Sequence, residues 1–476
     1  MSSSIYDYLI HHQDEKAISF HIPGHKSSAI YEDFGYGALL QNILDYDITE
    51  IHGADNLFDA QGIIKIAQDK YAKLLGVQES FFLVNGTSGG ILAAILSTVK
   101  KGNKLIISRD CHKSVFNALY LGDIQPVFLY PSLLDDLGIA SGYSVESLEK
   151  VILANPDADA VFIQNPNFYG IASDLTSIEK LVHSHGMILI VDEAHGAHLG
   201  FSDLLPLSAA QAKADIILQS VHKTLPALTQ SSILHVNSSK VDLDKLKYHL
   251  QVFQSSSPSY LLLASLDIAR DILERSGPAF IENLVRSLDV FYEEISKLSI
   301  IRILDPSSVF DFDKTKLNLY TYPNILSGYE LDILLRDEYR IYTELAGLNH
   351  VLAVTSIATS KHDLDYLLSA LRNMDSLLCK TSVTGKPAQV LPPILQMEPI
   401  RRTTITGALS SEKKRVDIRQ AAGSVCTDMI IPYPPGIPLL CPGEEVTPEI
   451  VDYLETLIQA NLKIIGITDR KISVKV

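Results

Sequence analysis

The 476-residue sequence contains no tryptophan and only four cysteines, at positions 111, 379, 426 and 441. These cysteines lack the close spacing of zinc ligands, and so few scattered residues do not predict a disulfide framework. No apolar run approaches the roughly 18 residues of a membrane-spanning helix. Residues 1–5 lack the charged and apolar regions of a secretory signal. We therefore expect a reduced, cytoplasmic protein.

Positive charge is also scarce. The chain has 40 lysines and arginines against 56 acidic residues, which gives a formal net charge of −16. No basic stripe of the kind that binds nucleic acid is present. The length predicts two to four domains, and the hydrophobic content of 46% is that of an ordinary globular protein.

The phosphate loop G-x-x-x-x-G-K-[ST] is missing as well. Its absence bears on Asp192-Glu193-Ala194-His195, because the same letters form the Mg²⁺-binding box of one helicase group, which needs that loop. A metal site of Asp192, His195 and His198 is another interpretation, but the usual helical pair of ligands four residues apart is lacking. Both interpretations are therefore disfavoured.

Short apolar runs alternate with helical patterns in the middle of the chain. Strands are expected at residues 81–84, 104–108, 125–129, 160–163, 187–191 and 215–218, and helices at 91–99, 145–153 and 177–185. Continuous apolar strands between amphipathic helices indicate a buried, mostly parallel sheet that is covered on both faces. The predicted fold class is α/β.

The patterns predict four regions. Residues 1–60 show little periodicity and are interpreted as an arm that packs on something else, such as a second subunit. A large domain at 61–295 is followed by a smaller α/β domain at 296–379, with strands at 300–303 and 316–320 and helices at 329–336 and 363–371. Residues 380–395 are interpreted as a linker. They open a C-terminal domain at 380–476, whose centre, 431–438, is too proline-rich for a helix or an inner strand.

Polar clusters follow the predicted strands at the edge where parallel α/β sheets bind ligands. They are residues 85–90, 109–113, 164–166, 192–195 and 219–223. In the first, Thr87 and Ser88 stand where a helix N-terminus attracts an anion, although a simple N-cap with a tight turn explains them too. His112 is either a surface histidine or an imidazole that stacks on an aromatic cofactor ring.

The last cluster contains Ser220, His222 and Lys223. Ser220 and His222 flank Val221, so on an extended segment both would point to the same side and reach a phosphate. A lysine after one apolar run and a carboxylate, Asp192, ending another are the minimum needed to hold pyridoxal 5′-phosphate. The lysine forms a Schiff base, and the carboxylate keeps the pyridine nitrogen protonated, so that the ring can accept electrons.

Each of these features is weak alone, since a lysine at a strand end is usually a solvated surface residue. Their order along the chain is more informative: phosphate cradle, stacking ring, carboxylate and then lysine. That order is expected for a pyridoxal-phosphate enzyme of the aspartate-aminotransferase fold.

The chain also resembles the bacterial ornithine/lysine/arginine decarboxylases of that fold. The matching segments run in family order: residues 23–26, 47–50, 85–88, 111–114, 192–198, 220–230, 432–438 and 442–444. The length is similar to that of the short branch of the family, which lacks an N-terminal wing domain.

The resemblance implies roles for the residues around the cofactor. Lys223 would be the Schiff-base lysine, Asp192 the partner of the pyridine nitrogen and His112 the stacking ring. The phosphate would be bound by Thr87, Ser88, Gly89, Ser220 and His222. Ala194 would leave room for the ring, and His195 would lie near its phenolic side. Ser256 or Ser257 would reach the neighbouring subunit's phosphate, which implies an obligate homodimer.

For the substrate, the resemblance implies α-decarboxylation of arginine, lysine or ornithine to an amine and CO₂, which would feed polyamine or acid-response metabolism. Glu344 would hold the distal cation, and Asp428 is a second acidic candidate. Lys223, His222 and Asp192 would be catalytic, with His222 or Lys223 as the proton donor to the α-carbon. An aminotransferase, a lyase and a catalytically silent relative stay open as alternatives.

The chain departs from the family pattern at two places. Gly89-Gly90 stands where larger or hydroxyl residues are common, and His52-Gly53-Ala54 replaces a stretch that is usually more acidic. Neither departure touches Lys223, Asp192 or His112. The expected cofactor is thus unaffected, and the choice among basic substrates is left open.

Overall fold

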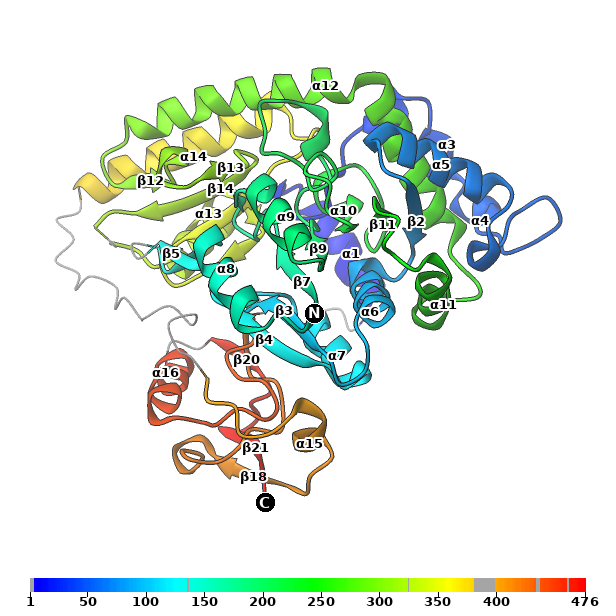
Figure 1. The fold of residues 1–476 in the computed structure, drawn as a ribbon. Helices are drawn as coiled ribbons and strands as arrows, with labels where there is room; N and C mark the ends of the chain where they lie inside the picture. The colour runs from blue at the N-terminus through cyan, green and yellow to red at the C-terminus, as the bar shows by residue number, and fades with distance from the viewer. Residues whose placement is uncertain (1–3, 135–136, 324, 381–398, 434–436, 460–461) are drawn as a thin grey trace.

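The computed structural model describes residues 4–134, 137–323, 325–380, 399–433, 437–459 and 462–476. Figure 1 shows a large unit around a central sheet, a smaller unit beside it and a C-terminal module below. None of the described helices combines the length and the apolar composition that crossing a membrane requires.

The large unit is built on a seven-stranded sheet in the order β2-β11-β10-β9-β7-β3-β4. Its strands are β2 (Glu79–Leu83), β3 (Lys104–Ser108), β4 (Gln125–Leu129), β7 (Ala158–Gln164), β9 (Ile188–Asp192), β10 (Ile216–Gln219) and β11 (Ser232–Val236). β11 runs antiparallel to both of its neighbours, β2 and β10, and the other paired strands of this sheet are parallel. The mostly parallel sheet is therefore confirmed, and β11 is a strand that the sequence pattern did not predict.

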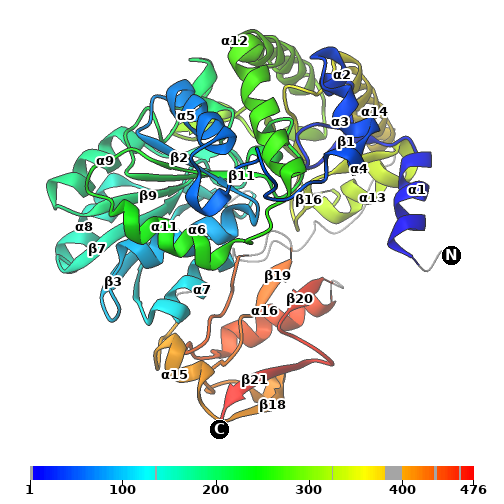
Figure 2. The same cartoon turned by 90° about the vertical axis from the view of Figure 1, so that its right-hand side faces the viewer.

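Helices cover both faces of this sheet, which explains the continuous apolar strands. In β3, Leu105 and Ile107 face one core together with α6 (Gly86–Thr98), α7 (Lys113–Gly122) and α11 (Leu243–Phe253). Ile106 faces the opposite core with α8 (Val145–Ala154) and α9 (Leu175–Ser184). Gly90 lets α6 approach closely, because a Cβ there would lie 2.6 Å from a methyl carbon of Leu83. Figure 2 shows the two layers of helices.

The smaller unit has a four-stranded antiparallel sheet. Its strands, in spatial order, are β12 (Ile301–Ile303), β14 (Lys316–Thr321), β17 (Val351–Val354) and β16 (Leu345–Ala346). They pack against α13 (Gly328–Tyr339) and α14 (Lys361–Lys380). Both helices were predicted from the sequence. The long helix α12 (Tyr260–Ser296) joins the two units, because its first part packs in the large unit and its last part in the small one.

The N-terminal region is more regular than its sequence suggested. Helix α1 (Ile5–Asp14) begins at Ser4, whose side chain accepts the Asp7 N–H, and none of its residues is buried. After it, β1 (Ile18–Phe20) pairs in parallel with β15 (Ile341–Thr343) of the same chain. Residues 18–20 thus pair within their own chain, whereas the packing of residues 1–60 on a second subunit stays a prediction. In Figure 2, α1 lies beside α13.

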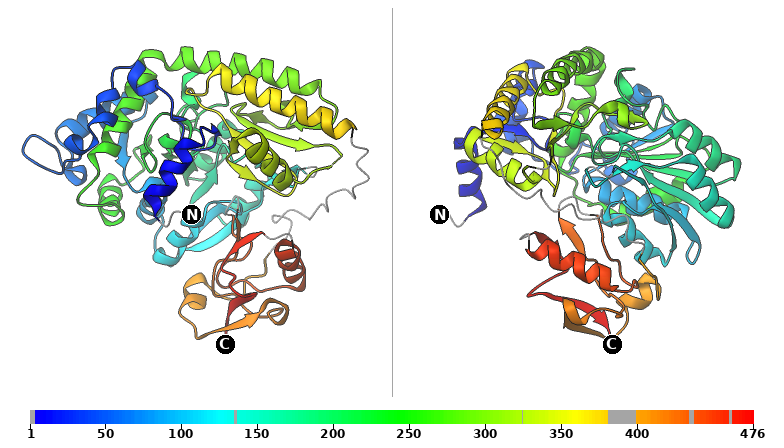
Figure 3. Two further views of the ribbon diagram at one scale, coloured as in Figure 1. Left: turned by 180° about the vertical axis from the view of Figure 1, so that it is seen from behind. Right: turned by 90° about the vertical axis from the view of Figure 1, so that its left-hand side faces the viewer.

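The C-terminal module has its own apolar core and lies below the other two units in both views of Figure 3. Its elements are α15 (Ile405–Leu409), β18 (Lys413–Asp417), β19 (Ile431–Tyr433), α16 (Pro448–Gln459), β20 (Lys463–Ile465) and β21 (Lys471–Lys475). The buried Arg109 ties it to the large unit by donating to the carbonyls of Pro438 (2.7 Å) and Leu439 (3.1 Å). The expected linker lies, after Lys380, outside the described residues, as do residues 434–436.

Further elements complete the described chain. They are α2 (Ile30–Asp33), α3 (Gly37–Gln41), α4 (Ile43–Tyr46), α5 (Ile63–Leu75), β5 (Ser132–Leu134), β6 (Ile139–Gly142), β8 (Ile171–Ala172), α10 (Val221–Thr224) and β13 (Asp311–Phe312), with 3-10 turns at Leu57–Asp59, Leu199–Phe201, Pro306–Ser308 and Ile418–Gln420.

Candidate active site

A cavity of about 430 Å³ lies at the carboxyl ends of the central strands. Of the residues predicted from the sequence, it brings together Thr87, Ser88, His112, Asp192, Ala194, His195, Ser220, His222, Lys223 and Glu344. Gly89, Ser256 and Asp428 do not line it. The edge of the sheet that the sequence singled out is therefore the edge that carries the cavity.

Lys223 lies in α10, a single helical turn directly after β10. The prediction of an extended segment here is wrong, because the chain turns at Ser220 and the Lys223 N–H donates to the Ser220 carbonyl at 3.0 Å. Ser220 and His222 still line the cavity, through different contacts. The Ser220 hydroxyl lies 3.0 Å from that of Thr87, and His222 Nδ1 donates to the Ser231 carbonyl at 2.9 Å.

Burial disfavours the positive charge of Lys223, whereas two acidic side chains favour it. Its Nζ is 3.0 Å from His195 Nε2. Desolvation lowers the pKa of Lys223, while the negative charges of Asp192 and Glu344 oppose the shift. A lysine with a lowered pKa has a larger fraction of neutral amine, which is the nucleophilic form.

Asp192 ends β9, and its Oδ1 accepts the Ala194 N–H at 3.1 Å. The side chain is buried, so desolvation raises the pKa of Asp192, against the opposing positive charge of Lys223. A cationic N–H donor bound in the cavity would stabilise the charged form of this carboxylate. Ala194 beside it adds only a methyl group and leaves space there.

Two histidines of the cavity are neutral and have defined tautomers. Desolvation lowers the pKa of both His112 and His222 to about 4. Nδ1 of His112 accepts the Ser114 N–H at 3.3 Å and so caps α7, which leaves its proton on Nε2. Nδ1 of His222 donates to a carbonyl, so its Nε2 carries no proton. His112 is therefore held by α7, with its ring facing the cavity.

His195 is almost fully buried, with its ring edge-on to Phe168 at a centroid distance of 4.7 Å. Burial lowers the pKa of His195 well below its usual value, and the charge of Lys223 adds to the shift. Its Nδ1 has no hydrogen-bond partner among the described residues. The His195 ring therefore contacts Lys223 through Nε2 and has Nδ1 available for a further hydrogen bond.

The N-terminus of α6 forms another wall of the cavity. Asn85 precedes the helix but makes no side-chain cap, because its amide donates to the Phe253 carbonyl at 2.9 Å. The interpretation as a simple N-cap is therefore wrong, and Thr87 and Ser88 stand at an uncapped 13-residue helix. Gly89 faces away from the cavity, since a Cβ there would lie 3.2 Å from the same carbonyl.

Residues from outside the central sheet close the cavity. Glu344 stands between β15 and β16, and its Oε2 accepts the N–H of Ile22 at 2.8 Å. Ile22 and Ile437 line the cavity too, from the N-terminal region and from the C-terminal module. The sequence drew attention to both segments as motifs but gave no sign that they meet here.

Three other candidates lie apart from the cavity. Ser256 is exposed in the loop after α11, and its predicted contact concerns a second subunit. Asp428 is half-buried and its carbonyl accepts the Cys426 thiol at 3.0 Å, so its predicted role has no support from this cavity. His198 forms an ion pair with Asp313 at 3.1 Å. Within the described ranges, no group of three or more His, Cys, Asp or Glu side chains could hold a metal ion.

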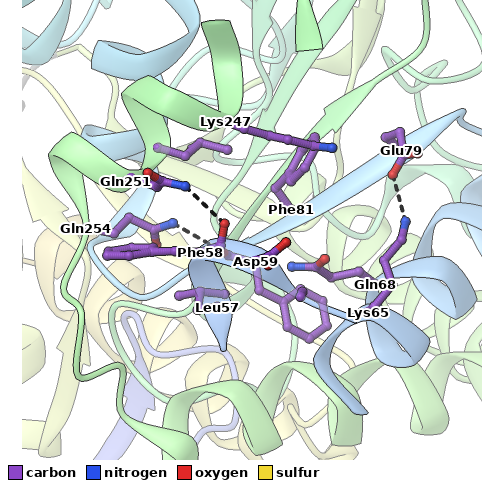
Figure 4. A pocket seen from close by; sticks show the side chains of 13 residues that line it. Leu57, Phe58, Asp59, Lys65, Gln68, Glu79, Phe81, Lys247, Gln251 and Gln254 are labelled. Carbon is purple, nitrogen blue, oxygen red and sulfur yellow. Dashed lines mark hydrogen bonds and ion pairs between the residues drawn. The ribbon is translucent and has the colours of Figure 1, made fainter. Parts of the chain in front are cut away.

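A second, smaller cavity of about 90 Å³ lies between α5, α11 and β2 (Figure 4). Two of its polar side chains have partners within it. Lys65 forms an ion pair with Glu79 at 3.0 Å, and Gln251 donates to the Phe58 carbonyl at 3.1 Å. It contains none of the residues predicted to be catalytic.

Comparison with known proteins matches most of the chain to one family. Residues 3–322 match the family model described as "Orn/Lys/Arg decarboxylase, major domain", and residues 389–470 match the C-terminal domain of the same family. An arginine decarboxylase of Bacillus subtilis is 34% identical, over 98% of this chain and 95% of the relative. One of Halalkalibacterium halodurans is 35% identical over the same shares of the two chains.

Solved structures are similar as well. A lysine decarboxylase of Francisella novicida has a TM-score of 0.81 at 22% identity, covering 97% of this chain and 80% of its own. An L-threonine transaldolase of Pseudomonas fluorescens has a TM-score of 0.60 at 17% identity, over 81% of this chain and 89% of its own. These likenesses confirm the predicted α/β fold of the pyridoxal-phosphate enzymes of fold type I.

Proposed function

Because the chain belongs to the Orn/Lys/Arg decarboxylase family, we propose that it removes the α-carboxyl group of a basic L-amino acid as CO₂. One observation carries the proposal: Lys223, Asp192 and Glu344 line the same cavity. Arginine is the first substrate to test, since relatives at 34–35% identity over nearly the whole chain are arginine decarboxylases. Lysine and ornithine follow.

The residues of the cavity fit pyridoxal 5′-phosphate. When bound, this cofactor accepts the electrons that the departing carboxylate leaves behind. The uncapped N-terminus of α6, with the hydroxyls of Thr87 and Ser220, suits its phosphate. Lys223 would hold its aldehyde, and the buried carboxylate of Asp192 would pair with its ring nitrogen. His112 would lie against the ring.

The protein would contribute charged side chains and apolar side chains that exclude water. Asp192 would stabilise positive charge on the ring nitrogen, and in a site that excludes water such a contact is stronger than in solution. Glu344 would bind the distal cation of the substrate by a charge-assisted hydrogen bond, which neutral amino acids cannot form. Phe168 and the apolar side chains of Ile22 and Ile437 would keep water out.

We propose Lys223 as the donor of the proton that replaces the carboxyl group. His222 is less suited, because its neutral ring carries its only proton on Nδ1, which is engaged with the Ser231 carbonyl. Protonation of its Nε2 requires a pH near 4. Lys223, in contrast, carries a transferable proton on Nζ when charged, and His195 Nε2 can accept a hydrogen bond from it.

A turnover assay with arginine, lysine and ornithine tests the proposal. The pyridoxal-loaded enzyme should release CO₂ and the matching amine from at least one of them. A keto acid in place of CO₂ would identify an aminotransferase, and cleavage of the Cα–Cβ bond a lyase. Failure to act on any of the three would leave a cofactor-binding relative without this activity. Removal of the carboxyl group consumes a proton, so the reaction would suit either amine synthesis or the response to acid.

The assembly proposed is a homodimer in which Ser256 reaches the cofactor phosphate of the neighbouring subunit. Its support is the exposure of residues 255–257 in a loop that does not face its own cavity. Sedimentation of the loaded enzyme, together with the cofactor affinity of a Ser256→Ala variant, tests it. A monomer with full activity would contradict the proposal.

A further inference from the structure

A chain of side-chain hydrogen bonds crosses four neighbouring strands of the central sheet. It begins at Glu193, the residue after Asp192, whose Oε2 accepts the Nε2–H of Gln219 at 2.6 Å. Gln219 Oε1 lies 3.1 Å from His235 Nε2, and His235 Nδ1 lies 2.8 Å from the Ser80 hydroxyl. These four side chains, here called the crossbar, come from the end of β9 and from β10, β11 and β2, and all four are buried.

The direction of these hydrogen bonds is fixed from one end. Both carboxyl oxygens of Glu193 accept an N–H, since Oε1 accepts that of Ala209 at 2.6 Å. Gln219 therefore presents its amide nitrogen to Glu193 and its oxygen to His235. Burial lowers the pKa of His235 to about 3, so the ring is neutral and its one proton lies on Nε2, facing that oxygen. Nδ1 then accepts the Ser80 hydroxyl, and no buried polar atom of the crossbar lacks a partner in the described chain.

The crossbar extends the pairing of β9 and β10 beyond their backbone register. That register ends at the pair Asp192–Leu218. The next residue of each strand, Glu193 and Gln219, continues the contact through its side chain. Strand ends without such a contact are free to shift relative to each other, so the crossbar fixes the place where both strands leave the sheet.

Two turns of the active site start from this place. The turn 192–196 supplies Asp192 and His195 to the cavity, and the turn 220–223 supplies Lys223. The two turns meet where Lys223 Nζ lies 3.0 Å from His195 Nε2. A shift between the ends of β9 and β10 would change this distance, together with the distance from the lysine to the carboxyl group of Asp192.

We propose that Glu193 and Gln219 are positioning residues, which fix the placement of Asp192 relative to Lys223 by joining the ends of β9 and β10. The inference rests on the proposed function, because Asp192 and Lys223 are the residues that would hold the cofactor. Neither Glu193 nor Gln219 lines the cavity, so neither would touch the cofactor or the substrate. Apolar side chains of the same shape would stabilise the sheet about as well, whereas hydrogen bonds also fix the direction of a contact.

Gln219→Met removes the contact, because methionine has about the same length but cannot bond to Glu193 or His235. The kcat for a basic amino acid should fall about 10- to 100-fold with little change in KM, since the reacting groups are misplaced but the substrate site is not altered. Equilibrium dialysis gives a readout without turnover. In it, the variant apoenzyme should bind pyridoxal 5′-phosphate about tenfold more weakly than the wild type.

Exchange of the two residues gives a rescue that a general loss of stability does not predict. In Glu193→Gln/Gln219→Glu, the amide at position 193 accepts the Ala209 N–H and donates to the carboxyl group at position 219, which also accepts the His235 N–H. Gln219→Glu alone brings two carboxyl groups together and should be impaired like Gln219→Met. The exchange should restore kcat and cofactor affinity to within about threefold of the wild-type values.

Asp375→Asn is the matched control for stability. The buried carboxyl group of Asp375 accepts the N–H groups of Ser299, Ile300 and Ile301 in the smaller unit, and it does not line the cavity. This variant should lower the unfolding midpoint in urea, as Gln219→Met does, but leave kcat and cofactor affinity unchanged.

Unchanged kcat and cofactor affinity in folded Gln219→Met would overturn the inference, as would a folded exchange variant that stays as impaired as Gln219→Glu. If Gln219→Met does not fold, Gln219→Asn, which withdraws the amide by one methylene group, takes its place with the same expected result. If the wild-type apoenzyme binds no pyridoxal 5′-phosphate, the proposed function fails as well. If it binds the cofactor but decarboxylates no basic amino acid, only the reaction fails, and the affinities still decide the inference.

Discussion

The two sides of the active-site cavity are built in different ways. On one side, Asp192 and Lys223 stand at or just beyond the ends of neighbouring strands of one sheet, and α6 begins directly after another strand. On the other side, Glu344 meets Ile22, which is 322 residues away in the sequence, and Ile437 comes from the C-terminal module. The first side belongs to one sheet, whereas the second depends on contacts between units.

This difference suggests a division of labour. The strand ends fix an amine, a carboxylate and the N-terminus of α6, which are the groups proposed to hold the cofactor. The contacts between units fix Glu344, which is proposed to meet the variable part of the substrate. Substitutions on the sheet side should therefore lower kcat, and substitutions on the other side should raise KM.

The largest effect is expected from Lys223→Ala, which removes both the group that holds the cofactor and the proposed proton donor. We expect a loss of activity of at least about 10³-fold. Borohydride reduction followed by mass spectrometry should find the cofactor attached to the Lys223 peptide in the wild-type enzyme and not in the variant. Lys113→Ala, an exposed lysine on the neighbouring helix, is the control. Attachment at another lysine would refute the assignment.

Asp192→Asn tests the same side with a smaller change. The variant keeps the shape of the side chain but removes its charge, so kcat should fall about 10²- to 10³-fold with little change in KM. Asp203→Asn, at an exposed carboxylate outside the cavity, is the control. A variant in which only KM changes would place Asp192 on the substrate's side instead.

Glu344→Gln moves the test to the opposite side. A glutamine can still accept the Ile22 N–H, so this hydrogen bond should be kept while the charge is lost. Loss of the charge pair should cost about 2–3 kcal/mol of binding free energy. We therefore expect kcat/KM for a basic amino acid to fall about 30- to 150-fold, mainly through a higher KM. Asp428→Asn, outside the cavity, should leave both parameters unchanged. An unaltered KM in Glu344→Gln would remove Glu344 from the substrate site.

The same division explains which features were legible in the sequence. Strands such as β3 and β9 were predicted because both of their faces are buried, which makes each a continuous apolar run. The missed strand, β11, contains His235, a residue that looks polar but is buried and bonded to Ser80 and Gln219 across the sheet. Its partners are distant in the sequence, so no local pattern reveals it.

The site follows the same rule. Lys223 and Asp192 could be proposed from position alone, because the ends of parallel strands meet at one edge. The turn at Ser220 was predicted to be extended, since four residues are too few for helical periodicity to show. The approach of Ile22 to Glu344 depends on the pairing of β1 with β15, which is a property of the folded chain. Pairwise contacts of this kind are absent from a single sequence.

The smallest effect is expected from Ile437→Ala. This variant tests the difference between the two sides of the cavity, because it alters only the contribution of the C-terminal module. Ile437 is half-buried, so truncation should remove about 1 kcal/mol of apolar contact and raise KM about fivefold with little change in kcat. The anchor of the module should be unaffected, because Arg109 binds the backbone carbonyls that follow rather than this side chain. Equal unfolding midpoints in urea would verify that point. A fall in kcat alone would instead show that the C-terminal module acts on the same step as the strand ends, and the division between the two sides would not hold.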